Sequence, residues 1–276
     1  MNPAAPTGGN RARAAAAAIE MSGVSIAAAG VLETAAVEGI DCAIGSGEYW
    51  VIGGPPGSGK SDLVATLAGL YRPLKGTLRF FGRDVATMDE EAFLVARLRI
   101  GLVFENGGRL FNHLTVVENI ALPLRYHNDH DSTGAEERVS WILEATGLAP
   151  LASRRPVEIK HAWRQRVGLA RALALAPEVL LFDNPLAGLG PQESRWWREF
   201  LAQLAAGHEL LGGRPATLVI ASHDLRPWTD QGRQFALLRQ KRWVRIGGRE
   251  ELAGSAEPLL GELLAAEFSF GRPDGP

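Results

Sequence analysis

Gly54-Pro55-Pro56-Gly57-Ser58-Gly59-Lys60-Ser61 is the stretch that decides the fold of this chain. It spells G-x-x-x-x-G-K-S, the P-loop pattern, in which successive backbone N–H groups surround a β-phosphate. In this pattern Lys60 reaches the β- and γ-phosphates, and the hydroxyl of Ser61 binds Mg²⁺. A plain glycine-proline turn needs neither residue at that spacing, so the stretch predicts a site for nucleotide phosphates.

The residues on either side of the loop fit a phosphate site. The run 48–52 predicts a short buried strand entering the loop, and 62–70 predicts an apolar helix leaving it. Phosphate would then lie at a helix N-terminus, where the dipole and unpaired N–H groups favour anions. Asp62 fits less well, because its charge would face the α-phosphate, although an acidic residue in the first helical turn is locally favourable.

Composition sets broad limits on the function. The chain has 276 residues, 46% of them hydrophobic, enough for one large domain or one domain with an inserted lobe. A net charge of −2 argues against a general nucleic-acid binder. The single cysteine, Cys42, excludes an internal disulfide and suits a reducing compartment, so a cytosolic location is expected. No stretch approaches the roughly 20 apolar residues of a membrane span, so any membrane role needs a partner.

The first half of the chain predicts several segments. Residues 1–18 are rich in alanine, proline and glycine, which predicts a flexible tail before one domain of residues 19–276. Strand-like pieces between residues 19 and 44 predict an antiparallel sheet. Residues from about 106 to 160 have a loop-rich start and then a helical pattern, which predicts an inserted helical lobe. In that lobe, His127-Asn128-Asp129-His130-Asp131 is interpreted as a hydrated loop, because no regular element there would fix metal ligands. Further strands are expected at 76–82 and 100–104, with a helix between them at 89–98.

The second half of the chain adds two polar strand ends. The apolar run Val179–Asp183 predicts a buried parallel strand that places an acid at its carboxyl edge. Such an acid typically holds Mg²⁺ through water, which makes Asp183 the companion of Ser61; the alternative is a helix N-cap. The strand predicted at 216–224 brings His223 to the same edge, unless this is an ordinary loop histidine. A helix at 162–175, a closing hairpin at 235–246 and a C-terminal amphipathic helix at 257–268 complete the expected order.

This order of features resembles the nucleotide-binding subunits of ATP-binding cassette (ABC) transporters, from about residue 19 to the C-terminus. The P-loop matches Walker A, residues 179–189 look like Walker B running into the D-loop, and Ser222-His223-Asp224 looks like the switch-histidine motif. The resemblance implies an α/β fold, a P-loop NTPase of ABC ATPase type, with a mixed-sheet core, an antiparallel β subdomain and an inserted helical subdomain. It implies ATP and Mg²⁺ as cofactors, with ATP bound by Gly54, Pro55, Pro56, Gly57, Ser58, Gly59, Lys60, Ser61 and Asp62.

Within that family, residues 107–125 are most similar to the ATPase subunits of Mla-type phospholipid transporters, which work with MCE-domain proteins in bacterial envelopes. Polar amino-acid importers share part of this pattern. The resemblance implies a membrane permease as partner, in an MCE-type complex, and a second cassette subunit in a homodimer or heterodimer. It also implies a cytoplasmic protein bound to the inner face of the cell membrane through that permease.

Two departures from the family pattern affect the expected chemistry. Asn184 stands where the family has the catalytic glutamate, and an amide cannot accept a proton from water. Loss of a general base typically costs about 10²–10⁴-fold in rate. Glu105 replaces the Q-loop glutamine and could approach Mg²⁺. The resemblance thus implies Ser61, Asp183 and Glu105 as metal residues, and His223 and the altered Asn184 at catalytic positions.

A third departure lies in the signature motif. Ile159-Lys160-His161-Ala162-Trp163 aligns with L-S-G-G-Q, so bulky side chains replace residues that approach the γ-phosphate on the opposite subunit. Gly190 replaces the D-loop aspartate, and residues 26–29 lack the aromatic that stacks on adenine. Two hypotheses therefore remain: an energy-coupling ATPase, with hydrolysis impaired, or a cassette-fold scaffold or regulatory subunit without turnover. An importer ATPase for another substrate is a further alternative.

Overall fold

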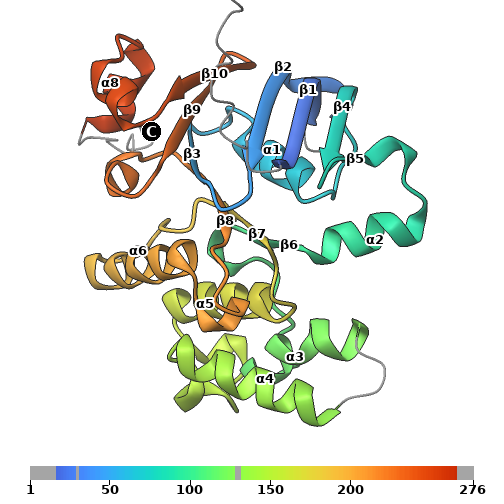
Figure 1. Ribbon diagram of the computed structural model, residues 1–276. Helices are drawn as coiled ribbons and strands as arrows, with labels where there is room; N and C mark the ends of the chain where they lie inside the picture. The colour runs from blue at the N-terminus through green and yellow to red at the C-terminus, as the bar shows by residue number, and fades with distance from the viewer. Residues whose placement is uncertain (1–16, 29–30, 128–131, 266–276) are drawn as a thin grey trace, which may run out of the picture.

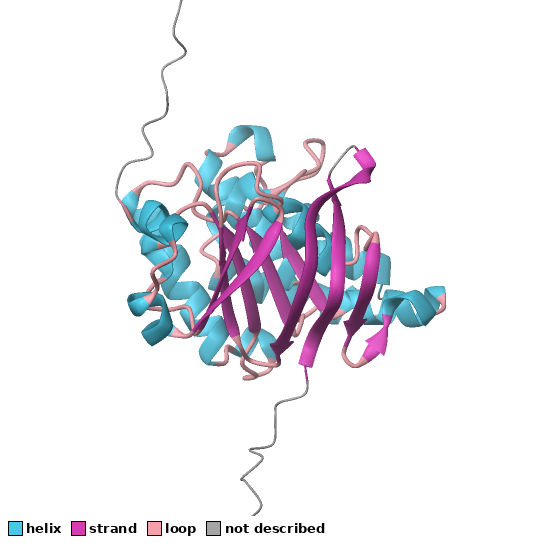
Figure 2. Ribbon diagram, turned by 90° about the horizontal axis from the view of Figure 1, so that it is seen from above, coloured by secondary structure: helices cyan, strands magenta, loops and turns pink. Residues whose placement is uncertain are grey.

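The computed structural model describes residues 17–28, 31–127 and 132–265. Its strands are β1 (Ala17–Ala28), β2 (Val31–Gly45), β3 (Tyr49–Gly53), β4 (Lys75–Phe80), β5 (Arg83–Asp84), β6 (Ile100–Val103), β7 (Val179–Asp183), β8 (Thr217–Ser222), β9 (Gln234–Arg239) and β10 (Arg242–Gly247). They form one ten-stranded sheet in the order β5-β4-β1-β2-β10-β9-β3-β8-β7-β6. Figure 2 shows this sheet crossing the molecule, with helices around it.

Helices cover the sheet and form a separate lobe. They are α1 (Lys60–Leu67), α2 (Glu90–Leu98), α3 (Val116–His127), α4 (Ser132–Ala145), α5 (His161–Leu173), α6 (Pro191–Ala206), α7 (Arg249–Gly254) and α8 (Pro258–Leu264). Short 3-10 turns are η1 (Val85–Thr87), η2 (Glu105–Gly107), η3 (Ala149–Leu151), η4 (Pro156–Glu158), η5 (Glu209–Leu211) and η6 (Arg226–Trp228). In Figure 1, α3, α4 and α5 gather below the sheet as the helical lobe.

The central strands are parallel and buried on both faces. Every residue of β3, β7 and β8 is buried, and β8 pairs in parallel with both of the others. Successive side chains of a strand point to opposite faces, so Val51 packs with the helical lobe while Trp50 and Ile52 pack on the side of α1. A strand covered on both faces must be apolar throughout, which is why these runs were predictable from the sequence.

The β subdomain is antiparallel and meets the core sheet at a narrow junction. β1 pairs antiparallel with β2 and β4. β2 meets β10 at the single register pair of Glu38 and Arg242, supported by the hydrogen bond from the Glu38 N–H to the Lys241 carbonyl (2.8 Å). β9 and β10 form the predicted closing hairpin.

Some predicted boundaries differ from the structure. β1 begins at Ala17, which pairs with Gly45, so the last two residues of the predicted tail 1–18 belong to the sheet. The rest of that tail lies outside the described residues. So do positions 128–131 of the proposed hydrated loop, while His127 ends α3. The predicted helix at 257–268 is described as α8, over residues 258–264.

Two features are absent from the described ranges. None of the helices within them is both long and apolar enough to cross a membrane. No cluster of three or more histidine, cysteine or acidic side chains within those ranges has the arrangement of a metal site.

Candidate functional site

A cavity of about 710 Å³ opens at the carboxyl ends of the central parallel strands. Its lining includes the residues predicted as the P-loop cation, as metal ligands or at catalytic positions: Lys60, Ser61, Glu105, Asp183, Asn184 and His223. They come from the start of α1 and from the ends of β6, β7 and β8. The carboxyl edge of a parallel sheet thus collects them, as expected for open α/β sheets.

Two glycines give the P-loop its course. Gly57 and Gly59 have φ values of +75° and +91°, in a region that L side chains rarely adopt. A Cβ on Gly59 would also lie 2.9 Å from Cγ2 of Val37 in β2. The β subdomain therefore packs directly against the turn before α1. Pro56 and Gly57 line the cavity, while Asp62 lies in the first turn of α1.

Lys60 is buried and held by its own loop. Its ammonium donates to the carbonyl oxygens of Gly54 (2.7 Å) and Pro55 (2.8 Å) and to Oγ of Ser58 (3.3 Å). Burial lowers the pKa of Lys60 to about 8, while the charges of Asp183 and Glu105 oppose that shift. The neutral carbonyls leave the charge of Lys60 uncancelled, which suits an anionic ligand, and the two acids nearby suit a metal ion bound together with that ligand.

Ser61 and Asp183 form the pair expected of a magnesium site. The Asp183 side chain is buried, with 7% exposure, and hydrogen bonds to Ser61. Burial raises the pKa of Asp183; the Ser61 hydrogen bond and Lys60 oppose this shift, while the charge of Glu105 adds to it. A hydroxyl and a carboxylate are oxygen donors of the kind that Mg²⁺ prefers. The residues present therefore fit MgATP: Ser61 and Asp183 toward the metal, and Lys60 toward phosphate.

Asn184 and Glu105 lie together beside this pair. Asn184 has a φ of 48°, a left-handed conformation that asparagine adopts more readily than most residues. Its Nδ2 donates to Oε1 of Glu105 at 3.5 Å, and its backbone N–H donates to the Ala221 carbonyl (2.8 Å). The backbone bond fixes the end of β7 against β8. Glu105 is exposed at the start of η2.

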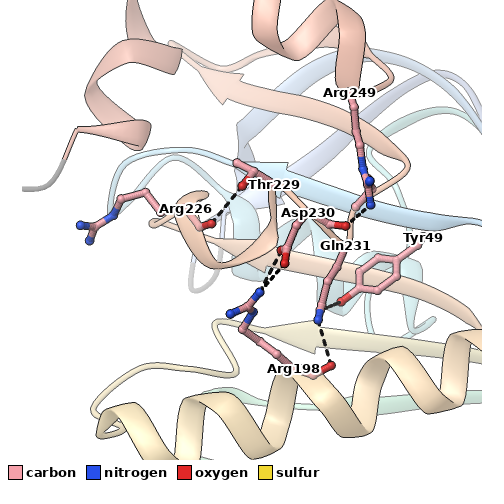
Figure 3. A network of polar contacts seen from close by, with 8 residues as sticks. Tyr49, Arg198, Arg226, Thr229, Asp230, Gln231 and Arg249 are labelled. Carbon is pink, nitrogen blue, oxygen red and sulfur yellow. Dashed lines mark hydrogen bonds and ion pairs between the residues drawn. The ribbon is translucent and has the colours of Figure 1, made fainter.

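The segment that follows His223, residues 226–231, is held in place by a polar network (Figure 3). Arg198 of α6 binds both carboxylate oxygens of Asp230 (2.9 and 2.7 Å). Gln231 donates to the Arg198 carbonyl (3.2 Å) and accepts from the Tyr49 hydroxyl (3.4 Å). Arg249 donates to the Asp230 carbonyl. Residues far apart in sequence thereby hold one wall of the cavity, and sequence patterns gave no sign of them.

The altered signature has its own packing. Lys160 is the N-cap of α5 without a side-chain cap, and the Nε2 of His161 would lie 3.4 Å from a Cβ on Gly188. The guanidinium of Arg166 stacks on Trp163 (4.5 Å) and on Trp196 of α6 (3.6 Å). Bulky side chains at this helix start are therefore accommodated within the subunit.

Asn119 is a structural residue that the sequence analysis missed. It is fully buried, and its Nδ2 donates to the carbonyls of Phe111 (3.1 Å), Leu114 (3.3 Å) and Thr115 (2.9 Å). Its Oδ1 accepts from the Phe111 N–H (2.9 Å). The available signal was an asparagine among the apolar residues Val116, Val117, Ile120 and Ala121. It fixes the loop so that the Phe111 ring is 42% exposed.

Comparisons with known proteins agree with this geometry. The family model described as ABC transporter matches residues 37–187, more than half of the chain. The probable ribonucleotide transport ATP-binding protein mkl of Mycobacterium leprae (strain TN) is 31% identical over 87% of this chain and 65% of its own length. The methionine import ATP-binding protein MetN of Brucella abortus (strain 2308) is 36% identical over 70% of this chain and 50% of its own length. The chain thus spans less than two thirds of these curated relatives.

Solved structures share the fold. The bacterial ABC transporter cassette MJ0796, in a dimeric structure, is 27% identical with a TM-score of 0.70, covering 81% of this chain and 95% of that one. The cbiO1 protein of Clostridium perfringens has a TM-score of 0.73 at 23% identity, covering 87% and 91% of the two chains. The predicted P-loop NTPase fold of ABC ATPase type is confirmed. With the family match over residues 37–187, the chain belongs to the ATP-binding cassette family of ABC transporters, which binds ATP with Mg²⁺.

Proposed function

We propose that this chain is the MgATP-binding subunit of an ABC transporter. The observation that carries the proposal is that Ser61, Asp183 and the buried Lys60 line one cavity at the carboxyl edge of the sheet. Hydroxyl, carboxylate and ammonium are the groups that a metal-bound triphosphate requires at a P-loop. When bound there, Mg²⁺ would neutralise part of the negative charge of the phosphates.

Hydrolysis is proposed to be impaired. Asn184 directly follows β7, at the position where the family pattern has a carboxylate, and its amide has no site for a proton from water. At the start of α5, Lys160, His161 and Trp163 replace small residues, so the opposite subunit would receive an altered contact. The second candidate is a cassette-fold scaffold or regulatory subunit that binds nucleotide without turnover, which the same substitutions support.

The transported substrate is proposed to be a lipid, in a complex of Mla type with an MCE-domain protein. The support is the sequence similarity of residues 107–125, which begin at the end of η2 and run into α3. The names of the relatives favour a different class, since they describe ribonucleotide transport and methionine import. An importer ATPase is therefore the alternative, and the identity of the copurifying permease separates the two.

A membrane permease is the proposed partner, with a second cassette subunit in a homodimer or heterodimer. The chain would lie on the cytoplasmic side of the cell membrane through that permease. Phe111 is the proposed contact, because Asn119 holds its loop while the ring remains exposed. Leu114 and Val117 beside it are half-buried, and Val117 packs against the core of the helical lobe. Phe111 is thus a better anchor than either neighbour.

Titration calorimetry tests the binding proposal. The parent should bind MgATP, and Lys60→Ala should bind it far more weakly, because its ammonium is the phosphate contact. Lys75→Ala is the matched control, since Lys75 is exposed on β4. Equal affinity of the parent and Lys60→Ala would refute phosphate recognition at the P-loop. For the partner, Phe111→Glu should abolish permease copurification while the exposed neighbour variant Asn112→Ala retains it.

A further inference from the structure

The sheet itself brings Glu105 and Asn184 face to face. β6 and β7 are parallel neighbours in which Val103 pairs with Phe182. Glu105 and Asn184 lie two residues beyond this pair on their respective strands, so they reach the same level past the carboxyl edge. Their side chains meet there, with Nδ2 of Asn184 donating to Oε1 of Glu105 at 3.5 Å, the long end of the hydrogen-bond range.

Glu105 lines the same cavity as Lys60 and Asp183. Its charge acts on the pKa values of both Lys60 and Asp183, raising each of them. These are the two groups assigned above to phosphate and metal. Glu105 therefore lies close to the volume that a γ-phosphate and its attacking water would occupy.

Three carboxylates line the described cavity: Glu105, Asp183 and Asp224. Asp183 is buried and bonded to Ser61. Asp224 has both oxygens bound by the guanidinium of Arg226, at 2.9 and 2.7 Å. Glu105 differs from both, because it is exposed and its side chain accepts from a neutral amide. Its carboxylate is thus the one best placed to accept a proton.

We propose that Glu105 is the general base for ATP hydrolysis and that Asn184 is the positioning residue that orients it. This rests on the proposed function, because the site must first hold MgATP. In the family pattern the amide follows β6 and the carboxylate follows β7. In this chain the carboxylate of Glu105 follows β6 and the amide of Asn184 follows β7. As the water oxygen bonds to the γ-phosphorus, its proton passes to Glu105, and the bond from that phosphorus to the bridging oxygen breaks with ADP as leaving group. Asn184 donates to the Glu105 oxygen and holds the carboxylate toward the water.

Glu105→Gln is the direct test, because it preserves shape and removes the proton acceptor. Phosphate release should fall by about 10²–10⁴-fold, while the calorimetric affinity for MgATP does not fall. Glu144→Gln is the matched control, an identical change at an exposed position of α4. Full turnover in Glu105→Gln would overturn the proposal. So would a loss of Mg²⁺-dependent nucleotide binding, since Glu105 would then be a metal ligand instead.

The reciprocal exchange tests the pairing. Glu105→Gln with Asn184→Glu places the carboxylate on β7 and the amide on η2, and should restore turnover above Glu105→Gln alone. Asn184→Ala should lower kcat with little change in KM, because it disorders the base without touching nucleotide binding. A double variant no faster than Glu105→Gln would contradict the exchange.

Unfolding without nucleotide gives a readout independent of activity. Asn184→Glu alone places two carboxylates face to face and should lower Tm. The double variant removes that repulsion, so Asn184→Glu should lower Tm less when Glu105→Gln is already present. Additive Tm shifts would mean that the two side chains do not interact.

These outcomes separate this proposal from the one on which it rests. If the parent binds MgATP no better than Lys60→Ala, the binding function fails. If the parent binds MgATP but shows no Lys60-dependent turnover, or if His223→Ala abolishes turnover while Glu105→Gln does not, only the role of Glu105 fails.

Discussion

The ammonium of Lys60 lies 2.7 Å from the carbonyl oxygen of Gly54, six residues earlier in the same loop. The P-loop thus closes on its own cation, at a position where the side chain is only 8% exposed. Neutral carbonyls satisfy the donors of the ammonium but do not cancel its charge. A phosphate that enters the cavity would supply the negative charge that balances the ammonium.

The first prediction concerns pH. The folded pKa of Lys60 is lowered to about 8 from 10.5, so the unfolded chain holds this proton at pH values where the folded chain has released it. Stability must then rise with pH above about 8, by about 1 kcal/mol between pH 8 and 9. The measurement is the parent minus Lys60→Met difference in unfolding free energy from pH 7 to 9. The difference cancels other groups, including Cys42, whose raised pKa acts in the opposite direction. A flat difference would show that Lys60 is not desolvated.

The second prediction concerns Asn119. Asn119→Ala should destabilise the protein by about 3 kcal/mol, because it leaves buried backbone groups without partners. Asn119→Asp should be at least as harmful, since a carboxylate would face three carbonyl oxygens that now receive hydrogen bonds. Urea unfolding measures both, with the exposed Asn112→Ala as control. Equal stability of all variants would mean that the loop is held by other contacts.

The third prediction concerns the aromatic stack in the altered signature. Trp163→Gln should cost about 1 kcal/mol, because it removes one of the two rings that flank the Arg166 guanidinium. Exposed Trp141, which lies 5.6 Å from Arg138, is a matched tryptophan on α4 for a control substitution to glutamine. Thermal unfolding gives the comparison. A larger loss of stability from the Trp141 substitution than from Trp163→Gln would contradict a stabilising role for the Trp163–Arg166 stack.

The fourth prediction concerns turnover. Asn184→Glu alone should not raise hydrolysis, because it removes the amide that orients Glu105 and because γ-phosphate and water must also be ordered by the signature of the opposite subunit. Adding Ser, Gly, Gly and Gln at positions 160–163 should raise it more than either change alone, as expected for groups that act as a unit. Steady-state phosphate release measures this. A parent whose Lys60-dependent rate already reaches about 1 s⁻¹, the low end of ordinary enzyme rates, would contradict impaired hydrolysis.

Local patterns were enough to predict the strand-loop-helix around Lys60 and the strand that ends in Asp183. A P-loop needs residues close together in sequence, and a buried parallel strand is apolar throughout. The start of β1 was not predictable from Ala17, because alanine has little preference for strands and is held there by pairing with Gly45.

Long-range contacts account for what the sequence left open. Arg138 donates to the carbonyls of Leu173 (2.8 Å) and Leu210 (2.6 Å), residues with no neighbouring pattern to mark them. The contact between Arg198 and Asp230 is of the same kind. Such side chains are ordinary surface charges in a linear sequence, and only the fold shows which carbonyl or carboxylate each one meets.

The single register pair between Glu38 and Arg242 divides the ten-stranded sheet into two parts, which are joined only at the narrow junction of β2 and β10. The stiffness of a sheet across its strands comes from the hydrogen bonds between neighbouring strands. Between β2 and β10 there is only one register pair, so the sheet resists bending least at this junction. The close packing of Gly59 against Val37 is a second connection, between the phosphate-binding loop and the antiparallel β subdomain. A shift of that loop would therefore rotate β1, β2 and β4 about the junction between β2 and β10.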